Sequence, residues 1–214
     1  MKKLLLCLFC VLQTLLVMAT VDATAIELLD KTSSIYKQST GTELSLRIGI
    51  DDAQSGQKQS VNGTLKTRDN RFVLATSFAT MHFDGTTLYI YQPDVNEITI
   101  SKPAESEISN MDPTQIMSNY NEGFQIPKPE FTTLNGKEVA IINLYPEDRS
   151  EDYFKLSLTI DAKTYMPIQI STHGKNGMVN TIDILKIEVN KNYSEKDLYF
   201  DLKKYPKAQI IDIR

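Results

Sequence analysis

An alternation of apolar and polar residues with a period of two runs through most of this chain and limits what it can fold into. Its clearest example is TELSLRIGI, residues 42–50, in which every second residue from Leu44 to Ile50 is apolar. Since successive side chains of a β-strand point to opposite faces, this pattern predicts a strand with one buried face. Similar stretches recur between turn-forming residues, so we expect a mainly β protein of antiparallel strands.

We expect nine to eleven short strands in a single domain. They lie near residues 42–50, 60–66, 71–79, 88–91, 98–100, 139–144, 153–160, 167–171 and 178–189, with an extended piece in 199–214. In 178–189 the apolar phase slips between Ile184 and Leu185, which indicates a β-bulge. So many strands either close into a barrel or curl into a sheet that helices cover.

Two helices are expected beside these strands. Residues 25–38 place Ile26, Leu29 and Tyr36 near one helical face. A shorter mid-chain helix is predicted after Asp112, a candidate N-cap followed by Pro113 at the first helical position, and would run to about residue 123.

The hairpin FDGTTLYIYQPDVNEITI, residues 83–100, is apolar on both faces. Leu88 and Ile90 point one way, and Tyr89 and Tyr91 point the other. An ordinary half-buried strand would carry polar residues on the second face. We expect the two tyrosines to be covered from behind by loops or by the C-terminal segment, although exposed tyrosines on a strand are also common.

The N-terminus has the layout of a secretory signal peptide. Lys2 and Lys3 precede an apolar run over residues 4–18, and small residues follow at Ala19, Ala23 and Ala25. The run is shorter than the roughly 20 residues needed to span a bilayer, so cleavage is favoured over a membrane anchor. We expect residues 1–23 to be the signal peptide and 24–214 the mature domain, with Ala23 or Ala25 the favoured last residue removed and Ala19 an alternative.

Charge and cysteine usage narrow the possible partners. Cys7 and Cys10 leave with the signal peptide, so the mature protein has no disulfide. Removing residues 1–23 from a chain with 23 basic and 27 acidic residues leaves 21 and 26, a net charge of −5. The sequence has no basic block, so we expect no nucleic-acid partner.

No constellation of catalytic or metal-binding residues is found in the sequence. His82 and His173 are isolated, whereas a zinc site needs three or four ligands. No nucleophile elbow or Ser-His pairing can be argued. We therefore expect no metal, no cofactor and no enzymatic activity.

Four segments together resemble the periplasmic outer-membrane lipoprotein carrier family, the LolA-like proteins. They are the N-terminal helix with its following strand (25–50), GTLKTRDNRF (63–72), DGTTLYIYQP (84–93) and FDLKKYPKAQIIDIR (200–214), the last similar to the Bacteroidetes type. The resemblance spans most of the mature chain. Where the family commonly has Arg-Pro, this chain has Arg68-Asp69.

The resemblance implies a curled, incompletely closed antiparallel β-barrel covered by the N-terminal helix and a short mid-chain helical lid. It also implies a periplasmic location, acyl chains of lipoproteins as cargo, an inner-membrane lipoprotein-releasing transporter, an outer-membrane acceptor and a monomeric carrier. The residues expected to bind lipid are Leu44, Leu46, Ile48, Phe72, Leu74, Leu88, Ile90, Ile116, Met117, Phe154, Leu156 and Leu158. Arg68 is expected at the rim, where it would assist release, with Arg71 as the alternative.

Two other functions fit a chain of this kind less well. One is a sensor of lipids or lipoproteins on the same half-barrel scaffold, but such sensors usually add a second domain. The other is an envelope hydrolase, for which the nucleophile constellation is missing.

Because small residues follow the apolar run directly, we predict a mature N-terminus between Thr20 and Ile26. Intact-mass measurement of the exported protein tests this. A mass that includes residues 1–19 would instead place the protein at the membrane.

Overall fold

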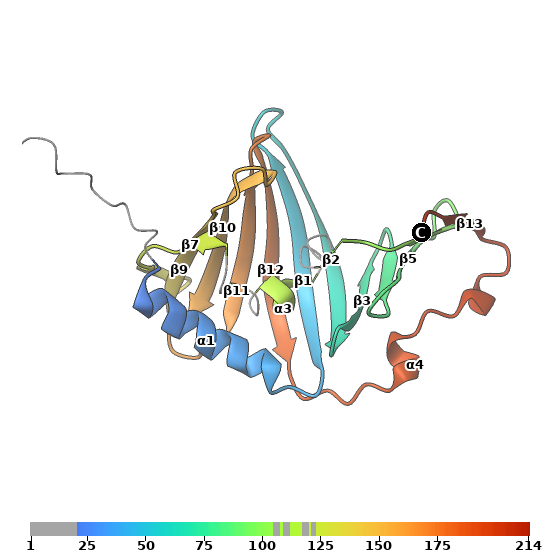
Figure 1. The fold of residues 1–214 in the computed structure, drawn as a ribbon, viewed down its shortest axis with the longest axis horizontal. Coiled ribbons are helices and arrows are strands. Elements are labelled where there is room, and N and C mark those ends of the chain that lie inside the picture. Colours follow the sequence, from blue (N-terminus) through green and yellow to red (C-terminus); the bar gives the residue numbers. More distant parts are fainter. Residues whose placement is uncertain (1–20, 105–107, 109–111, 117–119, 121–122) are drawn as a thin grey trace, which may run out of the picture.

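The computed structural model describes residues 21–104, 108, 112–116, 120 and 123–214, and its strands form one sheet (Figure 1). The sheet order is β13-β6-β5-β4-β3-β2-β1-β12-β11-β10-β9-β7, and β8 pairs with β9. The strands are β1 (Thr42–Asp52), β2 (Gln57–Arg68), β3 (Arg71–Thr76), β4 (Thr80–Phe83), β5 (Leu88–Gln92), β6 (Glu97–Ser101), β7 (Phe124–Gln125), β8 (Glu130–Leu134), β9 (Lys137–Pro146), β10 (Tyr153–Asp161), β11 (Pro167–Gly174), β12 (Met178–Glu188) and β13 (Gln209–Asp212). The helices are α1 (Ala23–Lys37), α3 (Pro113–Ile116), α4 (Glu195–Leu198) and the 3-10 turn η1 (Leu202–Lys204).

The expected fold class is confirmed: the sheet is mainly antiparallel, curled and not closed (Figure 1). The final pairing, of β13 with β6, is parallel. The described residues form thirteen strands, more than the expected nine to eleven, because the alternation did not reveal β4, β7 and β8. These are short, and all five residues of β8 are exposed, so they lack the apolar periodicity on which the expectation rested.

The strand expected over 71–79 ends early, at Thr76. The Thr76 hydroxyl accepts hydrogen bonds from the backbone N–H groups of Phe78 and Ala79 at 3.2 and 3.1 Å, and the chain turns there into β4. Hydroxyl side chains favour such turns because they offer the backbone a local partner. Phe78 consequently lies in the turn and is exposed.

Helix α1 begins with a side-chain cap from Asp22. The Asp22 carboxylate accepts hydrogen bonds from the backbone N–H groups of Thr24 and Ala25 at 2.9 and 3.1 Å. The preceding Val21 bridges to Ile126, and the Asp22 N–H donates to the Ile126 carbonyl at 2.8 Å. Cleavage after Ala23 or Ala25 would remove these contacts, whereas cleavage after Ala19 would keep them. Of the three sites, we therefore favour Ala19.

One face of the sheet, which we call the inner face, packs against α1. The helix buries Ala25, Leu28, Leu29 and Tyr36 in one core with strand residues such as Leu44 and Leu158. Figure 1 shows α1 lying across one end of the strands, so the opposite end of the inner face extends beyond it. The amphipathic helix expected over 25–38 is confirmed.

The mid-chain segment also reaches this core. Asp112 accepts hydrogen bonds from the Thr114 N–H and hydroxyl at 2.9 and 2.6 Å, which confirms it as the cap of α3. Tyr120 is buried in the core, and its hydroxyl donates to Asp30 on α1. The rest of the expected mid-chain helix lies mostly outside the described residues.

The predicted bulge in the strand 178–189 is confirmed. Ser45 of β1 pairs with Lys186 of β12, but the next residue, Leu46, pairs with Ile184. Leu185 is left without a partner and is 56% exposed. Because Leu185 is an extra residue in the strand, the side chain of Ile184 points inward, where it packs in the core.

The C-terminal segment, residues 193–213, explains why the hairpin is apolar on both faces. Leu88 and Ile90 contact the core on the inner face, whereas Tyr89 and Tyr91 lie on the outer face. Phe200 stacks on Tyr89 with ring centroids 5.0 Å apart, and Tyr205 lies 4.2 Å from Tyr91. The tyrosines are covered from behind by the C-terminal segment, as expected.

We predict that Phe200→Ala lowers the free energy of unfolding by about 3 kcal/mol, because the side chain is 5% exposed and its removal leaves a cavity. The adjacent Tyr199, 66% exposed, is the control, and Tyr199→Ala should change stability by less than about 0.5 kcal/mol. Urea unfolding of both variants measures this. Equal effects would mean that Phe200 does not anchor the segment.

Candidate functional site

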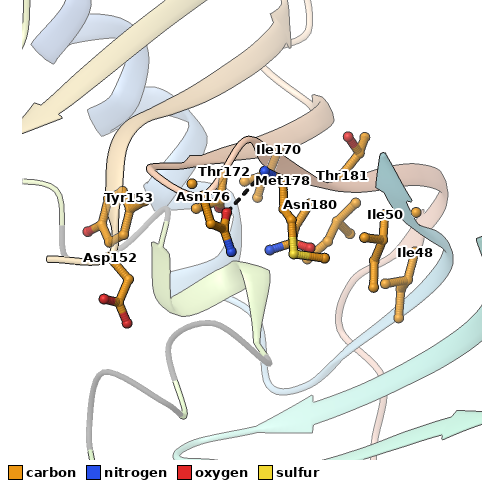
Figure 2. A pocket seen from close by; sticks show the side chains of 13 residues that line it. Ile48, Ile50, Asp152, Tyr153, Ile170, Thr172, Asn176, Met178, Asn180 and Thr181 are labelled. Carbon is orange, nitrogen blue, oxygen red and sulfur yellow. Dashed lines mark hydrogen bonds between the residues drawn. The ribbon is translucent and has the colours of Figure 1, made fainter. Parts of the chain in front are cut away.

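An apolar cavity opens on the inner face toward the ends of β1, β10, β11 and β12. Its volume is about 390 Å³. Figure 2 shows the side chains that line it, which are Ile48, Gly49, Ile50, Asp152, Tyr153, Ile170, Thr172, Gly174, Asn176, Met178, Asn180, Thr181 and Ile182. Pockets for small molecules commonly have volumes of about 300–1,000 Å³, so this one is at the small end.

Strand register brings the apolar floor of the cavity together. Ile48 of β1 lies opposite Ile182 of β12, which lies opposite Ile170 of β11. Directly paired residues on adjacent strands point to the same face of a sheet, so the three isoleucines form one row on the inner face. Two residues further along β1, Ile50 lies opposite Asn180, and the lining becomes more polar.

Polar groups gather on one side of this floor. The Asn176 Oδ1 accepts a hydrogen bond from the backbone N–H of Met178 at 3.0 Å, drawn as a dashed line in Figure 2. Asp152 and Tyr153 lie together beyond Asn176, on the side of the view opposite Ile48 and Ile50. Burial raises the pKa of the Tyr153 phenol, and the nearby Glu151 raises it further, so this hydroxyl stays protonated at neutral pH.

Most residues expected to bind lipid are packed into the core rather than around this cavity. Of the expected set, Ile48 lines the cavity. Ile90 is partly buried and packs against the core. The others placed in the core, all at most 5% exposed, are Leu44, Leu46, Phe72, Leu74, Leu88, Leu156 and Leu158. Their inward direction was predicted correctly, but they are buried in a core that also includes residues of α1 and Tyr120.

The expected inward placement of Phe154 is wrong. Tyr153 pairs with Gly174 and Lys155 pairs with His173, so Phe154 sits in an irregularity of β10 without a partner. Its side chain is 50% exposed, with its ring 6.0 Å from that of His173. Tyr153 lines the cavity in its place. Strict alternation counted back from Leu156 predicts that Phe154 points inward. It does not allow for the irregularity at Phe154, which turns Tyr153 inward instead.

Two expected mid-chain residues have no described side chain. Met117 lies outside the described residues, and α3 ends at Ile116, whose side chain is likewise outside them. Their lipid-binding role stays a prediction.

Arg68 lies at the end of β2, away from the cavity. Val61 of the same strand pairs with Ile48, and seven residues of β-strand separate Val61 from Arg68, a span of about 23 Å. The Arg68 guanidinium donates to the Tyr193 carbonyl at 2.5 Å and lies 3.5 Å from the Asp69 carboxylate. Arg71, the alternative, lies 3.8 Å from Glu195. Both arginines face the C-terminal segment, so neither is at the mouth of this cavity.

The expected set omitted most of the residues that form the cavity floor. Ile170, Met178 and Ile182 belong to predicted strands but were not selected. The signal that could have found them is strand pairing: once β12 is known to lie beside β1, Ile182 falls opposite Ile48. The sequence alone did not show that β12 and β1 are neighbours.

The described residues include no group of three or more His, Cys, Asp or Glu side chains placed to hold a metal ion. Among the same residues, no helix has the length and apolar character required to cross a membrane.

The curled sheet with α1 on its inner face defines an open β-barrel with an apolar pocket. The chain belongs to the outer membrane lipoprotein carrier protein LolA family, whose model matches residues 15–176. This is a family of lipoprotein carriers rather than of enzymes. The comparison with curated proteins found no match.

Solved structures share the fold at low sequence identity. An uncharacterized conserved protein from Thermus thermophilus aligns with a TM-score of 0.55 at 13% identity, covering 88% of this chain and 99% of its own. A DUF1329 family protein from Desulfovibrio piger aligns with a TM-score of 0.50 at 9% identity, covering 85% and 98%. At these identities the likeness concerns the fold alone.

We predict that Arg68→Leu binds an alkyl chain in the cavity with an affinity within about twofold of that of the unchanged protein. The reason is that about 23 Å of strand separates Arg68 from Val61, the residue that pairs with Ile48 of the cavity. The variant should lose about 1 kcal/mol of unfolding free energy, since a half-exposed charged hydrogen bond is lost. Arg71→Leu, whose ion pair is long and exposed, should lose less. Probe titration and urea unfolding measure both effects, and a tenfold loss of affinity would contradict the placement.

Proposed function

We propose that this protein is a periplasmic carrier that binds acyl chains of lipoproteins in an apolar cavity and ferries them to the outer membrane. The observation that carries the proposal is the apolar cavity on the inner face of a family fold matched over residues 15–176. The floor formed by Ile48, Ile170 and Ile182 provides hydrocarbon contacts, and polar groups border it on one side. An acyl chain with a polar end matches this division.

The energetics suit a carrier. Each CH₂ group moved out of water contributes about 0.8 kcal/mol, so a chain that buries about ten of them gains about 8 kcal/mol before the costs of association. That gain can hold a chain during transit and is small enough to be matched by a receptor or membrane that offers the same burial.

We propose that a larger lipid site lies beneath α1. Leu44, Leu46 and Leu158 are apolar and inward, but in this structure they lie in one buried core with Leu28 and Leu29 of the helix. Displacement of α1 would join this surface to the cavity. A lipoprotein with more than one acyl chain needs that additional surface, because about 390 Å³ is at the small end for a single ligand.

We propose that Arg68 assists release from its position at the end of β2, where this strand meets the mid-chain segment. The neighbouring Thr67 hydroxyl donates to the Asp112 carboxylate at 3.4 Å, which ties that segment to the sheet. Arg68 ties the C-terminal segment to the same strand end. In this position Arg68 would act on the closure of the fold and not on the head group of a ligand in the cavity.

The remaining parts of the proposal follow from the family. We propose export through a cleaved signal peptide, loading by an inner-membrane lipoprotein-releasing transporter, delivery to an outer-membrane acceptor, and action as a monomer.

We predict that Met178→Glu weakens binding of an uncharged fluorescent alkyl probe at least about tenfold, because a carboxylate in the apolar lining must be desolvated when the chain enters. Leu185→Glu, on the same strand but exposed at the bulge, is the matched control and should bind normally. Fluorescence titration of both folded variants tests the site. Unchanged binding in Met178→Glu would show that the cavity is not where chains bind.

A further inference from the structure

We propose that the cavity holds one acyl chain of an amphiphile whose polar end carries a protonated amine, and that Asp152 receives that amine. This inference rests on the proposed carrier function and specifies the ligand of the same site. It names a chemistry with two possible sources, an acylated peptide with a free N-terminal amine or a long-chain lipid amine.

The first step is the division of the cavity into an apolar floor and one polar side. Ile48, Ile170 and Ile182 offer no hydrogen-bonding side chain, so this part can hold only the hydrocarbon of a ligand. The polar end must then lie where Asp152, Asn176 and Asn180 border the cavity (Figure 2). A volume of about 390 Å³ favours one chain over several.

The second step is the state of Asp152. Its side chain is exposed at the border of the cavity, and within the described part of the chain it has neither an ion-pair partner nor a hydrogen-bond donor. Its backbone carbonyl is engaged by the Lys175 N–H at 2.9 Å, which holds the residue in place. A positioned carboxylate without a partner, next to an apolar cavity, is suited to accept a charge-assisted hydrogen bond from an ammonium group.

The third step is the surrounding charge. The loop between β9 and β10 carries four acidic residues and one basic residue, namely Glu147, Asp148, Glu151 and Asp152 against Arg149. Lys175 of the facing turn adds a second basic group, held by a hydrogen bond from its Nζ to the Arg149 carbonyl at 2.5 Å, so acidic groups still outnumber basic ones by four to two. Like charges repel across a partly desolvated mouth, so this border disfavours a carboxylate or phosphate head group and favours a cation.

The fourth step is the amide of Asn176. Its Oδ1 is occupied by the Met178 N–H, which leaves the Nδ2 hydrogens as its available donors. A carbonyl oxygen close to the amine of the ligand would be complementary to these donors. An acylated peptide offers such a carbonyl at its N-terminal residue, whereas a simple lipid amine does not, so the two sources differ at Asn176.

The experiment compares ligands of one chain length by displacement of an uncharged fluorescent alkyl probe from the mature protein. Dodecylamine, dodecanol and dodecanoate are used below their micelle concentrations. We expect dodecylamine to bind about tenfold more tightly than dodecanoate, with dodecanol between them, as for a partly solvated charge-assisted contact. A short peptide with one S-linked alkyl chain is tested with a free and with an acetylated N-terminus, and the free form should bind more tightly.

Asp152→Asn should bring dodecylamine and dodecanoate to within about twofold of each other without weakening dodecanol, because it removes the charge and keeps the shape. Glu147→Gln removes a charge from the same loop at a residue that does not line the cavity, and it should keep the preference. Asn176→Ala should weaken the peptide but not dodecylamine if peptides are the ligand. If Asn176→Ala binds both as tightly as the unchanged protein does, the site is assigned to lipid amines.

The outcomes separate this inference from the proposed function. Equal binding of amine, alcohol and acid would overturn the amine preference while the carrier function stands. A preference that survives in Asp152→Asn would overturn the role of that residue. Failure of all three chains to bind would overturn both the inference and the proposed function.

Discussion

The structure depends on burial of an apolar inner face that an open sheet cannot cover by itself. A sheet curled without closure leaves its concave side to be filled by something other than its own strands. Here α1 and Tyr120 fill one end of that side, where Leu44, Leu46 and Leu158 become fully buried. At the other end, beyond the reach of the helix, Ile48, Ile170 and Ile182 border a cavity. Ile170 is only 1% exposed and belongs to the core as well as to the cavity lining, so the site and the core are continuous parts of one surface.

The outer face shows the same requirement on a smaller scale. Over β3 to β6 it is apolar, and the C-terminal segment covers it with Phe200, Tyr205 and Leu198. This coverage uses stacked rings, with Phe200 and Tyr205 centroids 5.3 Å apart, and adds β13 along the edge of β6. Because the C-terminal segment of the same chain covers the apolar outer face, the hairpin tyrosines need no external partner.

For a carrier, partial coverage has a physical use. A fully packed inner face would leave no room for a ligand, and a fully open one would expose a large apolar surface to water. With α1 packed on part of the face, Leu44, Leu46 and Leu158 are buried, while Ile48 and Ile182 border the cavity. The position of Arg68 fits this arrangement, because it ties the C-terminal segment at the covered end of β2 and leaves the open end free.

Local patterns in the sequence determined most of the strands, the amphipathic character of α1, the cap at Asp112 and the bulge at Leu185, because each depends on neighbours a few residues apart. They also determined that Leu46, Ile48 and Leu158 point inward. Only the tertiary structure decided which of these inward residues are core and which line the cavity, since periodicity gives the face of a strand but not how far a helix covers it. The same limit explains Phe154, which an irregularity in pairing with β11 turned outward, and Arg68, whose distance from the cavity depends on strand register across β1 and β2.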